Sequence, residues 1–232
     1  MERYREDAIS NIESWGIVVN SFDGGGPSSV SADEVLTWLD SCPGGSVVHV
    51  CFRSHAVLNQ RQMDELAAGL ERSGVRFILC TKQSSRGGHV AAGDVRAVPE
   101  DFEARVARRG LMIRGWAPQV AILRHRAVGT FLTHYGWNSM LEGLSAGAVM
   151  LTWPMGVEQF VNAKLLVDEL GVGIRVGEGS EKILEAAELA FDQVIEGQST
   201  PKDAINGGSS NNDLSDFMRC MDRQRRSKIQ TF

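Results

Sequence analysis

The feature that most constrains the fold is a regular alternation between short apolar runs and longer segments whose apolar residues recur at helical spacing. Residues 46–52 are β-branched and apolar over a length that suits a buried strand, and residues 59–73 then place Met63, Leu66 and Leu70 on one helical face. A strand, a helix and a second strand in this order form a βαβ unit with parallel strands. The pattern therefore predicts an α/β fold with a parallel sheet.

The alternation continues to residue 170, which predicts one Rossmann-like domain with helices on both faces of its sheet. Ser31 is followed three residues later by Glu34, as in a capping box, and so marks the start of the first helix. The expected strands are residues 46–52, 75–81, 111–113, 128–133 and 149–153. The expected helices are residues 32–40, 59–73, 101–108, 119–123, 138–146, 158–170, 181–195 and 214–221. The glycines at 171 and 173 are interpreted as a turn.

Three segments follow from the composition along the chain. Residues 1–29 end in a glycine-rich stretch and are interpreted as a separate flap with a flexible linker. Residues 30–195 contain the alternating pattern and form the predicted Rossmann-like domain. Residues 196–232 are polar, glycine-containing and basic at the end, which predicts an irregular C-terminal region.

Overall charge and cysteine usage exclude several classes of protein. A net charge of −5 with 23% charged residues provides no broad basic surface for nucleic acid. The four cysteines form no C-x-x-C pair, which favours reduced thiols and a cytoplasmic location over a disulfide framework. The N-terminus lacks the apolar stretch of a signal peptide, and no run approaches the length of a membrane span.

A candidate anion site follows the predicted strand at 128–133. His134 comes first, Gly136 lets the backbone approach closely, and Asn138 and Ser139 are residue types that cap helices. Ligands of parallel sheets bind beyond the carboxyl ends of the strands, and a helix N-terminus offers free N–H groups with a partial positive charge. The sequence thus predicts a phosphate site without lysine, in which the His134 ring donates to a phosphate oxygen. A histidine satisfied inside the core is the alternative for His134.

The segment from Trp116-Ala117-Pro118-Gln119 to Pro154-Met155-Gly156-Val157-Glu158-Gln159 closely resembles the signature box of plant secondary-product UDP-dependent glycosyltransferases. Shorter stretches that resemble family landmarks lie at residues 38–41, 62–67, 74–77 and 99–102. The family has the GT-B fold, in which two Rossmann-like domains face each other across a cleft. This chain resembles the second, C-terminal domain, which binds the nucleotide sugar. Its first 20 residues resemble the closing segment of the other domain, so the resemblance implies that residues 1–29 are the end of the acceptor domain and a linker.

The resemblance implies a role for each residue of the donor site. Trp116 would stack on uracil and the backbone of Ala117 would bind the edge of the base, while Gln119 and Glu142 would bind the ribose hydroxyls. The positions that match diphosphate contacts are His134, Asn138 and Ser139. Those that match sugar contacts are Trp137, Glu158 and Gln159, and Ser54, in the loop after the first strand, completes the expected donor site.

The implied reaction is transfer of a hexose from a UDP-sugar to a hydroxyl of a small phenolic or flavonoid-like acceptor, with inversion. Gln159 favours UDP-glucose as donor, with UDP-rhamnose and UDP-xylose as the alternatives. The UDP-sugar is a co-substrate, and neither a cofactor nor a metal is expected. The family's general base is a histidine near the start of the other domain, so no catalytic residue is assigned within this chain. A truncated, non-catalytic module that binds a nucleotide sugar or a partner is the alternative function.

Two departures from the family pattern concern the donor site. Arg53 replaces a glycine in the loop after the first strand, where it either reaches a phosphate or blocks the close approach of the loop. Tyr135 replaces the usual cysteine and is expected to place a bulkier side chain beside the phosphate site. Residues 143–147 also satisfy the G-x-S-x-G formula of serine hydrolases, but Ser145 is predicted near the end of a helix rather than in a strand-to-helix elbow.

Overall fold

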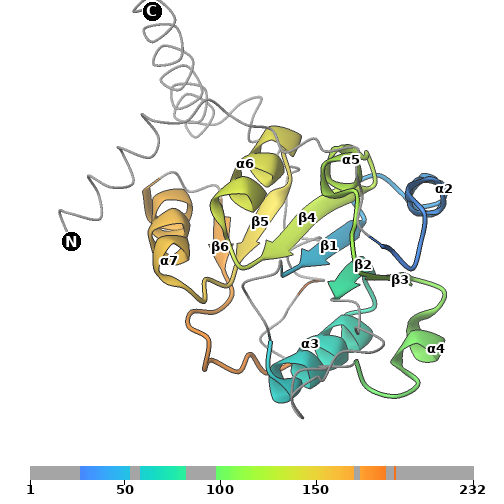
Figure 1. Ribbon diagram of the computed structural model, residues 1–232, viewed down its shortest axis with the longest axis horizontal. Coiled ribbons are helices and arrows are strands. Elements are labelled where there is room, and N and C mark those ends of the chain that lie inside the picture. Colours follow the sequence, from blue (N-terminus) through green and yellow to red (C-terminus); the bar gives the residue numbers. More distant parts are fainter. Residues whose placement is uncertain (1–26, 53–57, 82–97, 170–172, 187–190, 192–232) are drawn as a thin grey trace, which may run out of the picture.

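The computed structural model describes residues 27–52, 58–81, 98–169, 173–186 and 191 (Figure 1). Within them, six parallel strands form one sheet in the order β3-β2-β1-β4-β5-β6. This is the strand order of a Rossmann fold, so the predicted fold class is confirmed.

The strands are β1 (Val47–Cys51), β2 (Arg76–Thr81), β3 (Gly110–Arg114), β4 (Val128–Thr133), β5 (Val149–Thr152) and β6 (Gly173–Arg175). The helices are α2 (Ala32–Asp40), α3 (Gln60–Arg72), α4 (Phe102–Val106), α5 (Gln119–Arg124), α6 (Trp137–Ala146) and α7 (Val157–Lys164), and α7 continues as a π-helix, η1 (Leu165–Glu169). Strands β1 to β5 and helices α2 to α7 lie where the sequence predicted them, with bounds that differ by a few residues.

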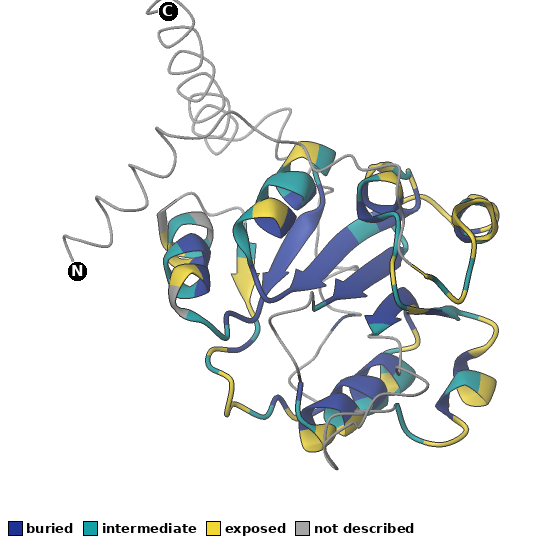
Figure 2. Ribbon diagram, viewed as in Figure 1, coloured by how far each residue is buried: buried dark blue, intermediate teal, exposed yellow. Residues whose placement is uncertain are grey.

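Helices cover both faces of the sheet, and the alternation of side chains along each strand separates two cores (Figure 1). On β1, Val47 and Cys51 pack with residues of α2, α5, α6 and α7, whereas Val48 and Val50 pack with residues of α3 and α4. Figure 2 shows the buried residues concentrated on the strands and on the helix sides that face them. Because both faces are covered, β1 is apolar in nearly every position.

The strand order reverses between β1 and β4, because the chain adds β2 and β3 on one side of β1 and then β4 and β5 on the other. Cys51 and Thr133, the last residues of β1 and β4, are partners in the ladder. The segments that begin at Phe52 and His134 therefore leave the same sheet edge from neighbouring strands. A crevice at such a reversal point is where doubly wound sheets bind ligands.

Strand β6 was not predicted, because the sequence analysis interpreted its glycines as a turn. Gly173 pairs with Met150 and Ile174 pairs with Leu151, so β6 extends the sheet beyond β5. The strand has only three residues and is half-buried or exposed, which makes its local signal weak. The apolar residues Ile174 and Val176, separated by one polar residue, were the available sign of a strand.

The helix expected at residues 181–195 is wrong over residues 181–186, which form turns and irregular structure. Side chains of α3 bind the backbone of this segment instead: Gln62 Nε2 donates to the carbonyls of Ser180 (2.8 Å) and Lys182 (2.7 Å), and the Glu65 carboxylate accepts from the Ala186 N–H (3.0 Å). Residue 191 is helical. Residues 1–26 of the expected linker segment, most of residues 187–195 of the expected helix, and the expected helix at 214–221 lie outside the described residues.

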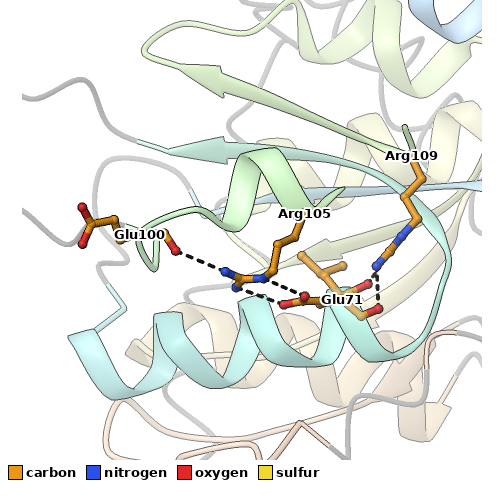
Figure 3. Close-up of polar contacts among 5 residues, drawn as sticks. Glu71, Glu100, Arg105 and Arg109 are labelled. Atoms are coloured by element: carbon orange, nitrogen blue, oxygen red, sulfur yellow. Dashed lines mark hydrogen bonds and ion pairs between the residues drawn. The ribbon is translucent and has the colours of Figure 1, made fainter. Parts of the chain in front are cut away.

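Two arginines close the C-terminal end of α3 (Figure 3). The Arg109 guanidinium donates to the carbonyl of Leu70 (2.7 Å) and to the carbonyl of Glu71, both in the last turn of the helix. Arg105 binds the Glu71 carboxylate with two hydrogen bonds (2.7 and 3.1 Å) and also reaches the Glu100 carbonyl (3.2 Å). Cationic donors at this end complement the helix dipole and satisfy carbonyls that lack a helical partner.

Candidate functional site

Helix α6 begins without a side-chain cap, directly after the strand at the reversal point of the sheet. Its N-cap residue is Gly136, which has no side chain that could cap the first turn. The expectation that Asn138 and Ser139 cap this helix is wrong, because both lie inside its first turn as the second and third residues. Their backbone N–H groups are among the four at a helix start that have no partner within the helix, and such groups are the donors that helix starts offer to anions.

His134 lies where the sequence placed it, between the end of β4 and the start of α6. The side chain is buried, with Nδ1 3.4 Å from the hydroxyl oxygen of Thr133. A Cβ atom at Gly136 would lie 3.0 Å from Nε2 of His134, so the ring sits directly against the backbone at the N-cap. A larger residue at 136 would therefore push the imidazole away from the start of α6.

Tyr135 has a left-handed backbone, with φ of 71°. The expectation that its side chain lies beside the phosphate site is wrong, because the ring is fully buried in the core formed with Met140, Met150 and Ala163. Burial raises the pKa of the Tyr135 hydroxyl well above its usual range, so the phenol stays neutral. The left-handed conformation explains how the loop sends this side chain into the core while His134 stays at the helix start.

Asn162, on the second turn of α7, is a contact that the sequence analysis missed. Its side-chain amide donates to the carbonyl oxygen of Tyr135 (3.1 Å), and the residue is buried. An amide at a buried position of an amphipathic helix was the available signal, since buried polar side chains need a specific partner.

Gln119 and Glu142, the two residues expected at the ribose, are in direct contact. Gln119 is buried at the first position of α5, and its Nε2 donates to the Glu142 carboxylate at 2.6 Å. The same nitrogen lies 3.5 Å from the hydroxyl oxygen of Ser139. The pair thus joins α5 to α6 and places a carboxylate one helical turn from Asn138, as predicted.

Trp116 is one of two exposed large apolar side chains among the described residues, with 42% of its surface accessible. It follows β3 after Gly115, whose φ of 98° turns the chain. The Trp116 N–H donates to the carbonyl of Pro27 (3.1 Å), and the Ala117 carbonyl accepts from the N–H of Gln119 (2.8 Å). These bonds fix the backbone on both sides of an exposed indole, which leaves its surface available for stacking.

The first turn of α7 carries Glu158 and Gln159. The buried Gln159 side chain caps its own helix, because its amide oxygen accepts from the N–H groups of Met155 (2.8 Å) and Gly156 (3.0 Å). Its amide nitrogen lies 3.5 Å from the exposed Glu158 carboxylate and is the part of the side chain with remaining capacity to donate. Trp137, at the first position of α6, is half-buried against the core.

Ser54 and Arg53 lie outside the described residues. Ser145 is the residue before the last of α6 and is exposed, so it does not occupy a strand-to-helix elbow, and the serine-hydrolase alternative loses its structural context. In the described part of the chain, no helix is long and apolar enough to cross a membrane.

One group of side chains in the described ranges, His49, Cys51 and Cys80, brings three potential metal ligands within 4.8 Å of one another. All three are buried in the sheet, and the His49 ring stacks on Phe131 with centroids 5.0 Å apart. The neighbouring Cys51 thiol and burial raise the pKa of Cys80, which opposes the thiolate form that a metal needs. We therefore interpret this group as core packing.

Comparison with known proteins identifies the family. The model of the UDP-glucoronosyl and UDP-glucosyl transferase family matches residues 41–213, which is most of the chain. The chain belongs to this family. Among curated plant UDP-glycosyltransferases, it is 42% identical to flavonol 3-O-glucosyltransferase UGT89B1 of Arabidopsis thaliana, over 94% of this chain and 55% of that protein. It is 44% identical to UDP-glycosyltransferase 89B2 of Stevia rebaudiana, over 82% of this chain and 46% of that protein.

Solved structures of plant UDP-glycosyltransferases share the fold. Arabidopsis thaliana UGT89C1 complexed with UDP-L-rhamnose matches with a TM-score of 0.66 at 36% identity, over 94% of this chain and 56% of that chain. A transferase from Siraitia grosvenorii in complex with UDP matches with a TM-score of 0.64 at 36% identity, over 84% of this chain and 46% of that chain. The present chain spans about half the length of the curated relatives that it matches.

Proposed function

We propose that this chain binds a UDP-sugar and supplies the donor-binding part of a glycosyltransferase that transfers the sugar, with inversion, to a hydroxyl of a small molecule. The observation that carries the proposal is the uncapped start of α6, where His134 and free N–H groups meet beside the Gln119–Glu142 pair. A diphosphate and a ribose are adjacent in a nucleotide sugar, and the two parts of this site are adjacent on one helix.

In the proposed complex, the diphosphate lies at the N–H groups of Asn138 and Ser139 and accepts from the ring of His134. The ribose hydroxyls exchange hydrogen bonds with Gln119 and Glu142, which bind each other at 2.6 Å without the ligand. This geometry supports a donor site that needs no metal, because the helix dipole and neutral donors face the phosphate charge.

The remaining parts of the donor follow from the flanking elements. Uracil stacks on the exposed indole of Trp116 and meets the backbone of Ala117. The sugar lies between Trp137 and the first turn of α7, where Glu158 accepts from its hydroxyls and the Gln159 amide nitrogen donates to them. Ser54 belongs to this donor site on sequence alone.

Glucose is the proposed sugar and a flavonoid-like phenol the proposed acceptor. One relative is a flavonol 3-O-glucosyltransferase, while a structural relative is complexed with UDP-L-rhamnose and another form of that relative with quercetin. We assign no general base within this chain and propose that residues 30–195 form the donor domain. A cytoplasmic location is supported by three cysteines that are buried as free thiols.

Calorimetric titration of the whole chain with UDP-glucose tests the proposal. We expect saturable binding that Glu142→Ala weakens by roughly tenfold or more, because it removes a charged hydrogen-bond acceptor for the ribose. The exposed Asp33→Ala on α2 is the matched control and should bind as the parent chain does. A folded chain that does not bind UDP-glucose, or an unaffected Glu142→Ala variant, would contradict the proposed site.

Incubation of the chain with UDP-glucose and a flavonol, followed by detection of the glycoside, separates the enzyme from the alternative binding module. Product formation in this assay establishes catalysis by this chain. Donor binding without product supports the reading of a nucleotide-sugar-binding module.

A further inference from the structure

Helix α7 is connected to the phosphate end of the site by one buried hydrogen bond. We propose that Asn162 is a positioning residue for the diphosphate: by binding the Tyr135 carbonyl, it holds the loop that aims His134 and the start of α6 at the phosphates. The inference rests on the proposed UDP-sugar function and assigns a role to a residue outside the signature segment that ends at Gln159.

The first step of the argument is the backbone of Tyr135. Its φ of 71° lies in the left-handed region, which a residue with a bulky side chain rarely adopts unless its surroundings fix it. Tyr135 is the single residue between His134, which follows the last residue of β4, and Gly136, which is the N-cap of α6. Its dihedral angles therefore set the direction of the helix start relative to the imidazole ring.

The second step is that Tyr135 is held at two points. Its ring is fully buried, and a Cβ atom at Gly173 would lie 3.3 Å from its hydroxyl oxygen, which shows how closely β6 covers it. Its carbonyl accepts from Asn162 Nδ2 at 3.1 Å. Burial of the ring does not by itself fix the orientation of the peptide group that follows Tyr135. The hydrogen bond from Asn162 to the Tyr135 carbonyl fixes this orientation.

The third step concerns the support on which Asn162 is mounted. Gln159 caps the first turn of α7 through Met155 and Gly156, so the helix start is itself ordered by hydrogen bonds. Asn162 follows Gln159 by three residues, so the two residues are neighbours on the surface of the same helix. The helix that carries the proposed sugar contacts therefore also fixes the proposed phosphate contacts.

The experiment compares binding of UDP and of uridine by the whole chain, measured by calorimetry for the parent and for Asn162→Leu and Asn162→Ala. Leucine keeps the side-chain volume without donating, and alanine removes both, so the pair separates the hydrogen bond from packing. Lys164→Ala is the control, because Lys164 is exposed on the same helix. Uridine contains the base and ribose but lacks the groups that Asn162 is proposed to serve.

We expect both Asn162 variants to bind UDP roughly tenfold more weakly, while uridine affinity stays within about twofold of the parent. Unchanged UDP affinity in the variants, or equal weakening for UDP and uridine, would overturn the role of Asn162. A parent chain that binds uridine and UDP equally, or neither, would overturn the proposed function together with this inference. Failure of the proposed role of Asn162 can thus be distinguished from failure of the proposed donor-binding function.

Discussion

Helices α3 and α6 follow the two strands at the reversal point of the sheet, yet their ends are treated in opposite ways. At α3, Asn59 and Gln62 form a capping box, and Arg105 and Arg109 bind groups of the last turn. At α6, among the described residues, no side chain caps the first turn, and the residue just before the N-cap has a left-handed backbone. Both ends of α3 are thus stabilised by side chains, whereas the start of α6 is not, which fits our proposal that its N–H groups bind a ligand.

The difference is informative because an unpaired helix start has a cost in free energy. A side-chain cap contributes about 1 kcal/mol, and α2 and α3 both have one. Polar groups that are left unsatisfied and backbones that are strained tend to cluster at functional sites. Helices α4 and α5 also begin without a side-chain cap, so the missing cap does not single out α6 by itself. What supports our proposal that α6 is the binding helix is the missing cap together with its position at the reversal point of the sheet and the His134 ring against its N-cap residue.

The largest effect is expected from a substitution that removes the side-chain contacts at the C-terminal end of α3. Arg109→Ala removes donors from the carbonyls of Leu70 and Glu71, so we expect unfolding to become easier by about 3 kcal/mol. Denaturant titration measures this change. UDP affinity of the folded variant should equal that of the parent, and a selective loss of UDP binding would show that the two sides are not independent.

A smaller effect is expected at the α2 cap. Ser31→Ala removes the hydroxyl that accepts from the N–H of Glu34, and should lower the free energy of unfolding by about 1 kcal/mol. Thermal unfolding checks the prediction, with Ser41→Ala at the other end of the helix as a comparison. No change in stability would mean that capping boxes contribute little here, and would weaken the inference from the missing cap at α6.

The smallest effect is expected from a substitution that adds a negative charge to the first turn of α6, which has no acidic residue. Asn138→Asp places a carboxylate in the first turn, where the helix dipole stabilises it by about 0.5 kcal/mol. The same charge repels a diphosphate, so UDP affinity should fall severalfold while stability rises slightly. Paired measurements of unfolding and UDP binding decide the point; a variant that gains stability and keeps its UDP affinity would place the phosphates elsewhere.

Much of the architecture was predictable because it is local. Strands such as β4 are apolar runs between breakers, and the capping boxes at Ser31 and Asn59 require residues three positions apart. Strand β6 and the segment at residues 181–186 were missed, since β6 depends on pairing with β5 and the segment is held by side chains of α3. Contacts between distant segments leave no periodic signal in the sequence.

The candidate site likewise contains features that the sequence predicted and features that it did not. The family resemblance placed Gln119 and Glu142 together, and the structure brings them into contact. The expectation that the Tyr135 ring lies near the phosphates was wrong, because the ring is buried in the core. The left-handed backbone that directs it there cannot be read from the residue type. The partner of the Asn162 side chain could not be predicted either, since the bond joins α7 to the backbone of the loop before α6, 27 residues earlier in the chain.

A crystal structure of the whole chain with UDP bound tests the central claim most directly. The account predicts that the phosphates lie at the N–H groups of Asn138 and Ser139, within hydrogen-bonding distance of the His134 ring, with the ribose at Glu142. A diphosphate bound elsewhere, with the start of α6 left to water, would contradict it.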